Sequence, residues 1–271
     1  MRYFWWRTRV PRIWRRIAVP TAVGVLLLSA CGSGGDGADN AAAPVTLTKV
    51  MSLDFEQAAA PLAAGATISS ALANGPGGAV ELAGATPRPL RLVTGRADKG
   101  HGVAFPPPCP ATADPTCPKA IIEVADDLAL DPGAEDYEWG ASVLLEPDET
   151  SKGSNIMQKG FSVGGGSQWK LQVDGDNGHP SCVVVGEGES RIHDVYADVT
   201  IADGKWHDVT CRRDEAKLVI TVDGAHRKST KIAKSLTISP AGPMRIGGKS
   251  LKPNNDQFFG TLDDVFVSTA Q

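Results

Sequence analysis

The sequence lacks an apolar run long enough to remain in a membrane as a spanning helix, which needs about 20 residues. Its apolar segment at residues 17–30 has only 14 residues and contains Pro20. Six arginines and no acidic residue precede that segment. A basic start, a short apolar core and small residues at its end are typical of an export signal, so we exclude residues 1–30 from the fold.

Cysteine is also scarce, with five in 271 residues. One of them, Cys31, directly follows Leu28-Ser29-Ala30, and this stretch resembles the lipobox of bacterial lipoproteins. The resemblance implies that the leader is removed and that Cys31 carries a diacylglyceryl group. Each buried acyl methylene contributes about 0.8 kcal/mol to membrane binding. There are two alternatives: an ordinary cleaved leader with an incidental cysteine, and an uncleaved membrane anchor.

The segment after the cysteine has little but small residues, "GSGGDGADNAAAP". A glycine-rich stretch without a period is typical of a flexible tether, and we assign residues 31–45 to it. The expected location is therefore the cell membrane, with the protein anchored by lipid and facing the extracytoplasmic side.

Four cysteines remain for the exported body: Cys109, Cys117, Cys182 and Cys211. The compartment is oxidising, and four cysteines allow three connectivities. We favour Cys109 with Cys117 and Cys182 with Cys211, worth about 2.5 and about 3.5 kcal/mol from loop entropy. A zinc site is the rival interpretation, but no C-x-x-C spacing exists and no histidine is placed to complete one.

The exported part is poor in basic residues. Without the six leader arginines it has 21 Lys and Arg against 31 Asp and Glu, a net charge of −10. Such a body is a poor partner for nucleic acid or anionic lipid. Carbohydrate, peptide and divalent cations remain open as ligands. The sequence does not determine the oligomeric state.

Long helical patterns are few from residue 46 onward, whereas short alternating runs separated by turn signals are many. This pattern predicts an all-β sandwich or barrel, and roughly 225 residues suit one large sandwich. In "LVITV", Leu218, Ile220 and Val222 share one face. The Asp223-Gly224 pair that follows predicts a hairpin turn.

The order of motifs carries a second resemblance. "YEWGASVLLEP", "NIMQKG", "SQWKLQV", "DGKWHDVTCRRD", "LVITVDG", "MRIGGK" and "FFGTLDDVFV" follow one another, as in the laminin-G-like or concanavalin-A-like jelly-roll family. The resemblance covers residues 46–271 and implies two packed antiparallel sheets with adjacent first and last strands. It would tie Leu53 and Phe55 to Leu262 and Phe266.

The aromatic and histidine residues within these motifs have structural interpretations. Trp206 follows an Asp-Gly turn at a strand start, and Trp139 and Trp169 lie inside alternating strands. We expect all three in the core. We expect His207 to be a hydrogen-bonding residue rather than a catalytic base.

Enzyme motifs are missing as well. No G-x-S-x-G, H-E-x-x-H or glycine-rich phosphate loop is present. Jelly-roll hydrolases carry their paired carboxylates, about 5 Å apart, on an E-x-D-x-x-E strand. Only Glu146-Pro147-Asp148 begins this pattern, and Ser151 stands in place of the second glutamate. We expect no enzyme, although carboxylates from different strands can converge.

The resemblance also implies rim loops that hold calcium, sugars or proteins, and calcium needs several oxygen ligands. Two polar loops are candidate ligand-binding rims, and their alternative interpretation is a plain solvated turn. Their residues are Asp174, Asp176 and Asn177 in one loop and Asn254, Asn255 and Asp256 in the other.

A third candidate, for calcium, combines Asp54 on the first strand with Asp263 and Asp264 on the last. Alternation places Asp264 on the face of Leu262 and Phe266, so an inward carboxylate would need a partner. A structural calcium ion or backbone amides would each supply it.

Together these features predict a membrane-anchored lipoprotein with a non-catalytic domain that binds carbohydrate or protein. A glycan-cleaving enzyme on the same fold and a structural envelope protein without a small ligand are the alternatives.

Overall fold

The computed structural model describes residues 45–109, 114–175 and 177–270. The predicted signal segment, Cys31, nearly all of the tether and Asp176 lie outside this part of the chain. Within it, no helix combines the length and apolarity that crossing a bilayer would require.

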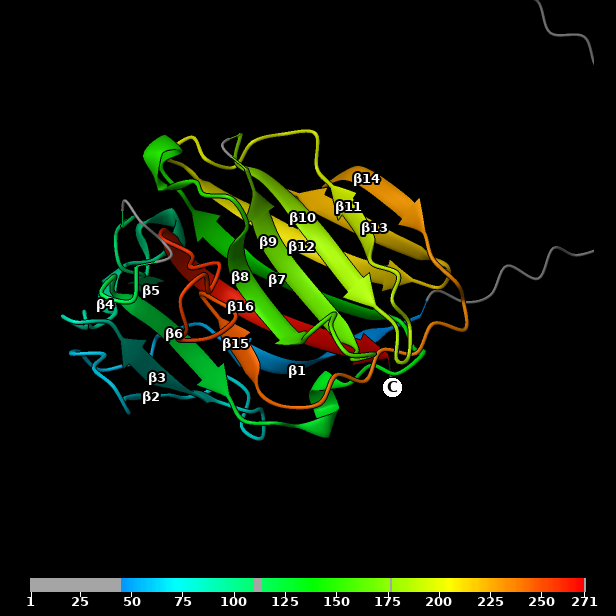
Figure 1. Cartoon of the computed structure of the whole chain (residues 1–271), viewed down its shortest axis with the longest axis horizontal. Coiled ribbons are helices and arrows are strands. Elements are labelled where there is room, and N and C mark those ends of the chain that lie inside the picture. The colour runs from blue at the N-terminus through cyan, green and yellow to red at the C-terminus, as the bar shows by residue number, and fades with distance from the viewer. Residues whose placement is uncertain (1–44, 110–113, 176, 271) are drawn as a thin grey trace, which may run out of the picture. The chain divides into compact units, whose positions relative to one another are not determined.

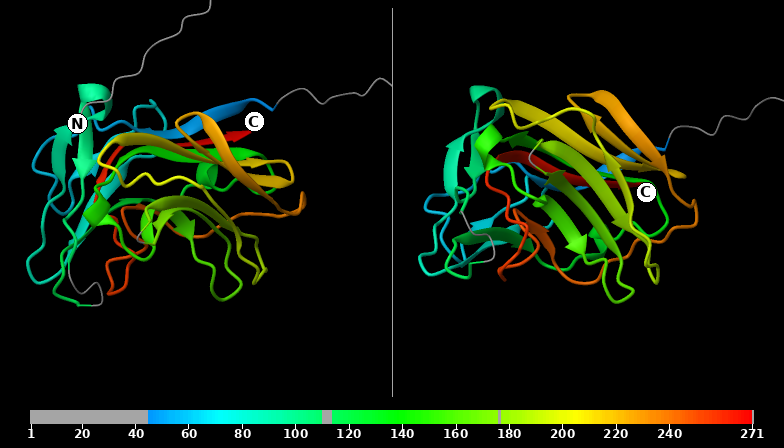
Figure 2. Two further views of the ribbon diagram at one scale, coloured as in Figure 1. Left: turned by 90° about the horizontal axis from the view of Figure 1, so that it is seen from above. Right: turned by 45° about the horizontal axis from the view of Figure 1, so that its top comes forward.

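The domain consists of two antiparallel sheets packed face to face, as Figure 1 and Figure 2 show. The all-β jelly-roll prediction is therefore confirmed. Sheet I contains β1 (Leu47–Leu53), β4 (Arg91–Thr94), β5 (His101–Ala104), β7 (Tyr137–Leu144), β12 (Trp206–Asp214), β13 (Lys217–Val222), β14 (Ala225–Lys231) and β16 (Thr261–Ala270). Sheet II contains β2 (Thr67–Ile68), β3 (Gly78–Ala83), β6 (Lys119–Val124), β8 (Ser154–Gly160), β9 (Gln168–Asp174), β10 (His179–Val185), β11 (His193–Tyr196) and β15 (Met244–Ile246).

The strand order places the last strand in the interior of sheet I, between β7 and β5. That order is β14-β13-β12-β7-β16-β5-β4, and β1 also pairs with β16. Sheet II has the order β11-β10-β9-β8-β15-β6-β3-β2. The expected adjacency of the first and last strands is thus confirmed by the antiparallel β1–β16 ladder.

In the described part of the chain, three short 3₁₀ helices connect the strands: η1 (Arg96–Asp98), η2 (Leu128–Leu130) and η3 (Pro147–Glu149). The start of the carboxylate pattern therefore lies in a helical turn and not on a strand. Glu146 and Glu149 form a capping box around η3, in which each carboxylate accepts a backbone N–H. Both side chains are thus used to build this turn.

Alternation and turn chemistry explain β13. Leu218, Ile220 and Val222 are buried, whereas Val219 and Thr221 are half-buried. Asp223 and Gly224 both have positive φ, 53° and 71°, as a primed hairpin turn requires. The β13–β14 hairpin forms as predicted.

The core lies between the sheets and is centred on aromatic rings. Trp139 on β7 and Trp169 on β9 are fully buried, with ring centroids 5.8 Å apart. Trp139 also stacks on Tyr137 at 4.7 Å. The expectation that Trp206 packs into this core is wrong. Trp206 is half-buried and pairs with Leu144, on the outer side of sheet I.

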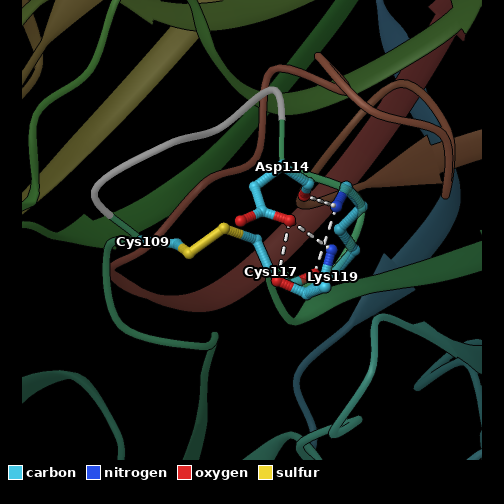
Figure 3. Close-up of a disulfide and its surroundings, with 5 residues drawn as sticks. Cys109, Asp114, Cys117 and Lys119 are labelled. Atoms are coloured by element: carbon cyan, nitrogen blue, oxygen red, sulfur yellow. Dashed lines mark hydrogen bonds between the residues drawn. A yellow bond between two sulfur atoms is a disulfide. The ribbon is translucent and has the colours of Figure 1, made fainter.

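Both predicted disulfides are present. Cys182 on β10 and Cys211 on β12 join the two sheets, and Cys109 pairs with Cys117. Figure 3 shows the second of these with Lys119, whose Nζ donates to the carbonyl oxygens of Asp114 at 3.2 Å and Cys117 at 3.1 Å. The buried ammonium and the disulfide together fix this turn beside β6.

A bulge in β16 changes the expected orientation of its two aspartates. The register shifts between Asp263 and Phe266, and Asp264 has a φ of 47°. Consequently Asp263 is buried and Asp264 is exposed, the reverse of the prediction. In the β1–β16 ladder, Leu53 lies opposite Val265 instead of Leu262 or Phe266.

Candidate functional site

Polar side chains line the outer side of sheet II on β8, β9 and β10. In these strands Trp169, Leu171 and Cys182 point into the core, so their neighbours point outward. We call the outward set the polar face. It consists of Asn155, Gln158, Lys170, Gln172, Asp174 and Ser181.

The strand register brings these residues together from separate parts of the chain. Asn155 pairs with Gln172, Gln172 with Ser181, and Ser181 with Tyr196 of β11. Four strands therefore contribute to one row that crosses the sheet. Tyr196 is 41% exposed and places an aromatic ring at the end of this row.

Hydrogen bonds fix much of the polar face. The Asp174 carboxylate accepts from Gln172 Nε2 at 2.6 Å and from Ser181 Oγ. Asn155 Nδ2 donates to Gln158 Oε1. Asn155 Oδ1, however, is buried and has no hydrogen-bond partner within the described residues. An acceptor of this kind costs free energy until a donor reaches it.

Charges of both signs meet at Lys170. Burial lowers the pKa of the Lys170 ammonium, while the negative charges of Asp256 and Asp174 act in the opposite direction. Lys249 forms an ion pair with Asp256 at 2.8 Å. The lysine is half-buried on β9, so the site presents a partly desolvated cation between two carboxylates.

The charge of the Asp174 carboxylate also affects Tyr196, at the end of the row. Burial, with the Asp174 charge as the next contribution, raises the pKa of Tyr196 to about 12. Tyr196 therefore stays a neutral phenol, able to donate and accept hydrogen bonds. On another part of the sheet, the Arg245 guanidinium lies 5.9 Å from the ring centroid of Phe161, which is 41% exposed.

The predicted rim residues divide into two groups. Asp174, the last residue of β9, and Asp256, from a loop, both lie close enough to Lys170 to affect its pKa. Asn177 and Asn254 are exposed. Asn255 is buried, and its Nδ2 donates to Ser250 O at 2.9 Å and Gln257 Oε1 at 3.0 Å, so it shapes the loop.

The candidate calcium residues do not assemble as a site. The Asp263 carboxylate accepts hydrogen bonds from the backbone N–H groups of Arg96 at 2.9 Å and Asp264 at 2.7 Å. Backbone amides, the alternative to a calcium ion, thus supply the partner of this buried carboxylate. Asp54 accepts from Glu56 N at 3.2 Å. In the described part of the chain, no three Asp, Glu, His or Cys side chains are grouped to hold a metal ion.

His207 has the structural surroundings that the sequence suggested. Its Nδ1 lies 2.8 Å from Asp223 Oδ2, and its Nε2 lies 3.0 Å from Asp203 Oδ1. Burial by itself lowers the pKa of His207, but the hydrogen bonds to these two aspartates outweigh it and raise the pKa. The imidazole thus ties two turns of sheet I together.

Comparison with known families and structures agrees with the two-sheet fold. The model of the concanavalin A-like lectin/glucanases superfamily matches residues 130–270. No curated protein sequence is significantly similar to the chain.

Among solved structures, domain 4 of AbnA, a GH43 extracellular arabinanase from Geobacillus stearothermophilus in complex with arabinotriose, is 14% identical. Its TM-score is 0.58, with 83% of this chain and 93% of that one covered.

Two toxin domains are also similar. The binding domain of Paraclostridial Mosquitocidal Protein 1 is 14% identical with a TM-score of 0.53, covering 82% of this chain and 49% of that one. The binding domain of Botulinum neurotoxin DC in complex with SialylT is 13% identical with a TM-score of 0.53, covering 81% and 47%. This chain thus spans about half the length of these two toxin domains. At such identities the likeness concerns the fold.

Proposed function

The chain belongs to the concanavalin A-like lectin/glucanases superfamily, and on that basis we propose that it is a lipid-anchored surface protein whose domain binds glycans without cleaving them. The polar face of sheet II is the proposed binding site. Cys31 is the proposed attachment point of the lipid. The residues after Cys31 give the domain reach from the membrane surface.

The observation that carries the glycan proposal is the combination of a half-buried cation, Lys170, with an exposed aromatic ring, Tyr196, on the outer side of sheet II. Beside them, the cross-strand row of Asn155, Gln172 and Ser181 is itself buried. An ammonium group donates hydrogen bonds, and a phenol both donates and accepts them, which suits the many hydroxyl groups of a sugar. Tyr196 adds an exposed ring against which the apolar side of a sugar can pack.

The similar solved structures give support of a second kind. One is an arabinanase domain in complex with arabinotriose, and another is a toxin binding domain in complex with SialylT. Each is a complex of a domain of this fold with a glycan-type ligand. The acidic character of the exported body, with its net charge of −10, also favours glycan over nucleic acid.

A glycan array with the full-length protein in detergent, in calcium and in chelator, tests the ligand class. Arabinotriose, titrated by calorimetry, is the first defined probe. Lys170→Met removes a charged donor from the polar face, and we expect it to weaken glycan binding about tenfold, because a hydrogen bond to a charged group contributes about 1.5–3 kcal/mol. Gln172→Ala removes a buried neutral amide that donates to Asp174, and we expect a smaller loss, since a neutral hydrogen bond contributes about 0.5–1.5 kcal/mol. Loss of binding in chelator alone would support the calcium expectation.

Lys231→Met is the matched control, since Lys231 is exposed on β14 of sheet I. Unchanged binding in both polar-face variants would refute the proposed site. Silence on the array in both solutions would favour the structural envelope protein, and release of reducing ends from a polysaccharide would favour the enzyme.

Mass spectrometry of the mature N-terminus tests the anchor. We expect a chain that begins at Cys31 with added acyl mass, and we expect Cys31→Ala to release the protein from the membrane fraction. An unmodified Cys31 on an intact leader would refute this part of the proposal and leave the glycan site untouched.

A further inference from the structure

A separate pocket opens on sheet I, away from the polar face. It has a volume of about 270 Å³. Two arginines belong to its lining, and we call it the arginine pocket. Its main residues are Arg88, Arg91, Phe105, Pro106, Glu149 and Phe259.

The pocket lies where β4, β5 and β16 pair. Arg91 is opposite Ala104, and Ala104 is opposite Thr261. The next residues along, Val103 and Leu262, are fully buried in the core. Because successive side chains of a strand alternate, the row that starts at Arg91 faces outward.

The apolar wall of the pocket is fixed before any ligand arrives. Phe105 and Phe259 are only 3% and 4% exposed. Phe105 N donates to Gly260 O at 3.0 Å, and its ring meets Phe258 edge-on at 5.6 Å. A few residues further, Cys109 is closed onto Cys117 by the disulfide of Figure 3. A wall built in this way needs no ordering on binding.

The charged groups of the pocket are available to a ligand. Arg88 and Arg91 are exposed. In contrast, Arg96 and Arg245 each have a carboxylate partner. Within the described residues, the side chains of Arg88 and Arg91 make no hydrogen bond and no ion pair. A guanidinium group can bind a carboxylate through two parallel hydrogen bonds. The two unpaired arginines of the pocket therefore suit a ligand that carries a carboxylate.

The other residues that line the arginine pocket determine which kind of anion it favours. Glu149 is held in place because its Oε2 accepts from Glu146 N at 2.9 Å. A second carboxylate beside the arginines disfavours a densely charged anion, but it accepts hydroxyl donors well. Phe259 and Pro106 offer apolar surface. With a volume of about 270 Å³, the pocket is slightly smaller than most ligand pockets, which measure about 300–1,000 Å³. It therefore suits a single sugar ring.

We propose that the arginine pocket binds a uronic acid residue of an acidic glycan, with its carboxylate between Arg88 and Arg91, its hydroxyl groups on Glu149 and its ring against Phe259. This inference does not depend on the polar face, which belongs to the other sheet. The protein would then have two separate glycan sites of different charge preference.

Calorimetry of the full-length protein with trigalacturonate, with galactotriose as the neutral counterpart, tests the inference. We expect trigalacturonate to bind at least tenfold more tightly than galactotriose, and more weakly as salt rises from 50 to 500 mM. Arg88→Gln combined with Arg91→Gln should weaken trigalacturonate binding at least tenfold. Both side chains are exposed, and a melting curve verifies that the variant is folded.

Arg191→Gln is the matched control, because Arg191 is an exposed arginine outside the pocket. Lys170→Met separates this proposal from the glycan site of sheet II, and it should leave trigalacturonate binding unchanged. Equal binding by the double arginine variant and the native protein would overturn the inference. So would equal affinity for galactotriose, or full displacement of trigalacturonate by an equal concentration of inorganic phosphate.

Discussion

Cys182 and Cys211 form a covalent bond between the two sheets, with their Cα atoms 5.6 Å apart. Both residues are fully buried. The bond closes a loop with a sequence separation of 29, whereas Cys109 and Cys117 are separated by only 8. The cross-sheet bond therefore restricts the unfolded chain more than the loop bond does.

Replacing Cys182 and Cys211 together by alanine should lower the free energy of unfolding by about 3.5 kcal/mol. Guanidinium denaturation with linear extrapolation measures this loss. The same change at Cys109 and Cys117 is the comparison, with an expected loss of about 2.5 kcal/mol. A larger loss for the loop pair would contradict the chain-entropy explanation.

Lys159 provides a test of buried charge. Its side chain is fully buried, its Nζ donates to the Asp131 carboxylate and to Pro240 O at 2.8 Å, and Asp126 lies 2.8 Å away with 54% exposure. Asp131→Ala should cost about 3 kcal/mol, because it leaves the ammonium poorly compensated. Asp126→Ala should cost less than about 1 kcal/mol. Equal losses in urea denaturation would show that the exposed partner is as important as the buried one.

Asp263 and Asp264 should differ sharply in spite of their adjacency. Asp263→Ala deprives two backbone amides of their acceptor, at a cost of about 1–3 kcal/mol. Asp264→Asn keeps a residue type that tolerates positive φ at an exposed position. We expect the second change to stay within about 0.5 kcal/mol. Thermal melts of both variants test whether Asp263 stabilises the fold and Asp264 tolerates replacement.

Stability should depend on pH through His207. Its pKa is raised in the folded protein, so folding favours the protonated imidazole. The stabilising contribution is complete below the unfolded pKa of about 6.5. It is lost as the pH rises through the folded value.

His207→Gln should therefore flatten the fall in stability above about pH 6.5. Melting temperatures between pH 5 and 9 measure this slope. His226→Gln, at an exposed position on β14, is the control and should keep the native slope. A steeper fall in the His207 variant would mean that the imidazole is not the group responsible.

A second titration at the same site acts at low pH. Hydrogen bonds from Lys205 and His207 lower the pKa of Asp203 to about 2. The contribution of Asp203 to stability is therefore present above its unfolded pKa and is lost as the pH falls toward 2. The Asp203–His207 pair thus stabilises the fold most in the range between these two titrations.

The sequence contained enough local chemistry to predict the strands and the disulfides. Alternation in Lys217–Val222 and the Asp223-Gly224 turn are properties of neighbouring residues, and they determined β13 and its hairpin. Cys182 and Cys211 could be paired because each lay in a separate candidate strand. These features depend on short stretches of chain, which a single sequence displays directly.

The orientation of β16 could not be predicted from strict alternation. A bulge adds one residue to a strand and reverses the faces beyond it. Asp264 was the available signal, since aspartate is enriched at positive φ, but its sequence context did not distinguish a bulge from a regular strand. The error at Trp206 has a similar origin, because alternation alone does not indicate which face is inward near a turn.

The polar face was missed for a different reason. Asn155, Gln172 and Ser181 come together only through the registers of β8, β9 and β10. Each is an ordinary polar residue in its own strand. Asp174 and Asp256 were singled out as loop residues, but their shared neighbour Lys170 depends on how a distant loop folds back, and this long-range contact has no local signal.

Leu47 at the start of β1 is paired with Ala270 at the end of β16. The two ends of the folded body are thus neighbours across a single ladder. A short glycine linker could join these two ends, and new ends could be opened at the tip of the β13–β14 hairpin. The resulting circular permutant would keep every strand pair and lose only the covalent turn between β13 and β14. The order in which the strands are synthesised can then be changed without changing the order in which they lie.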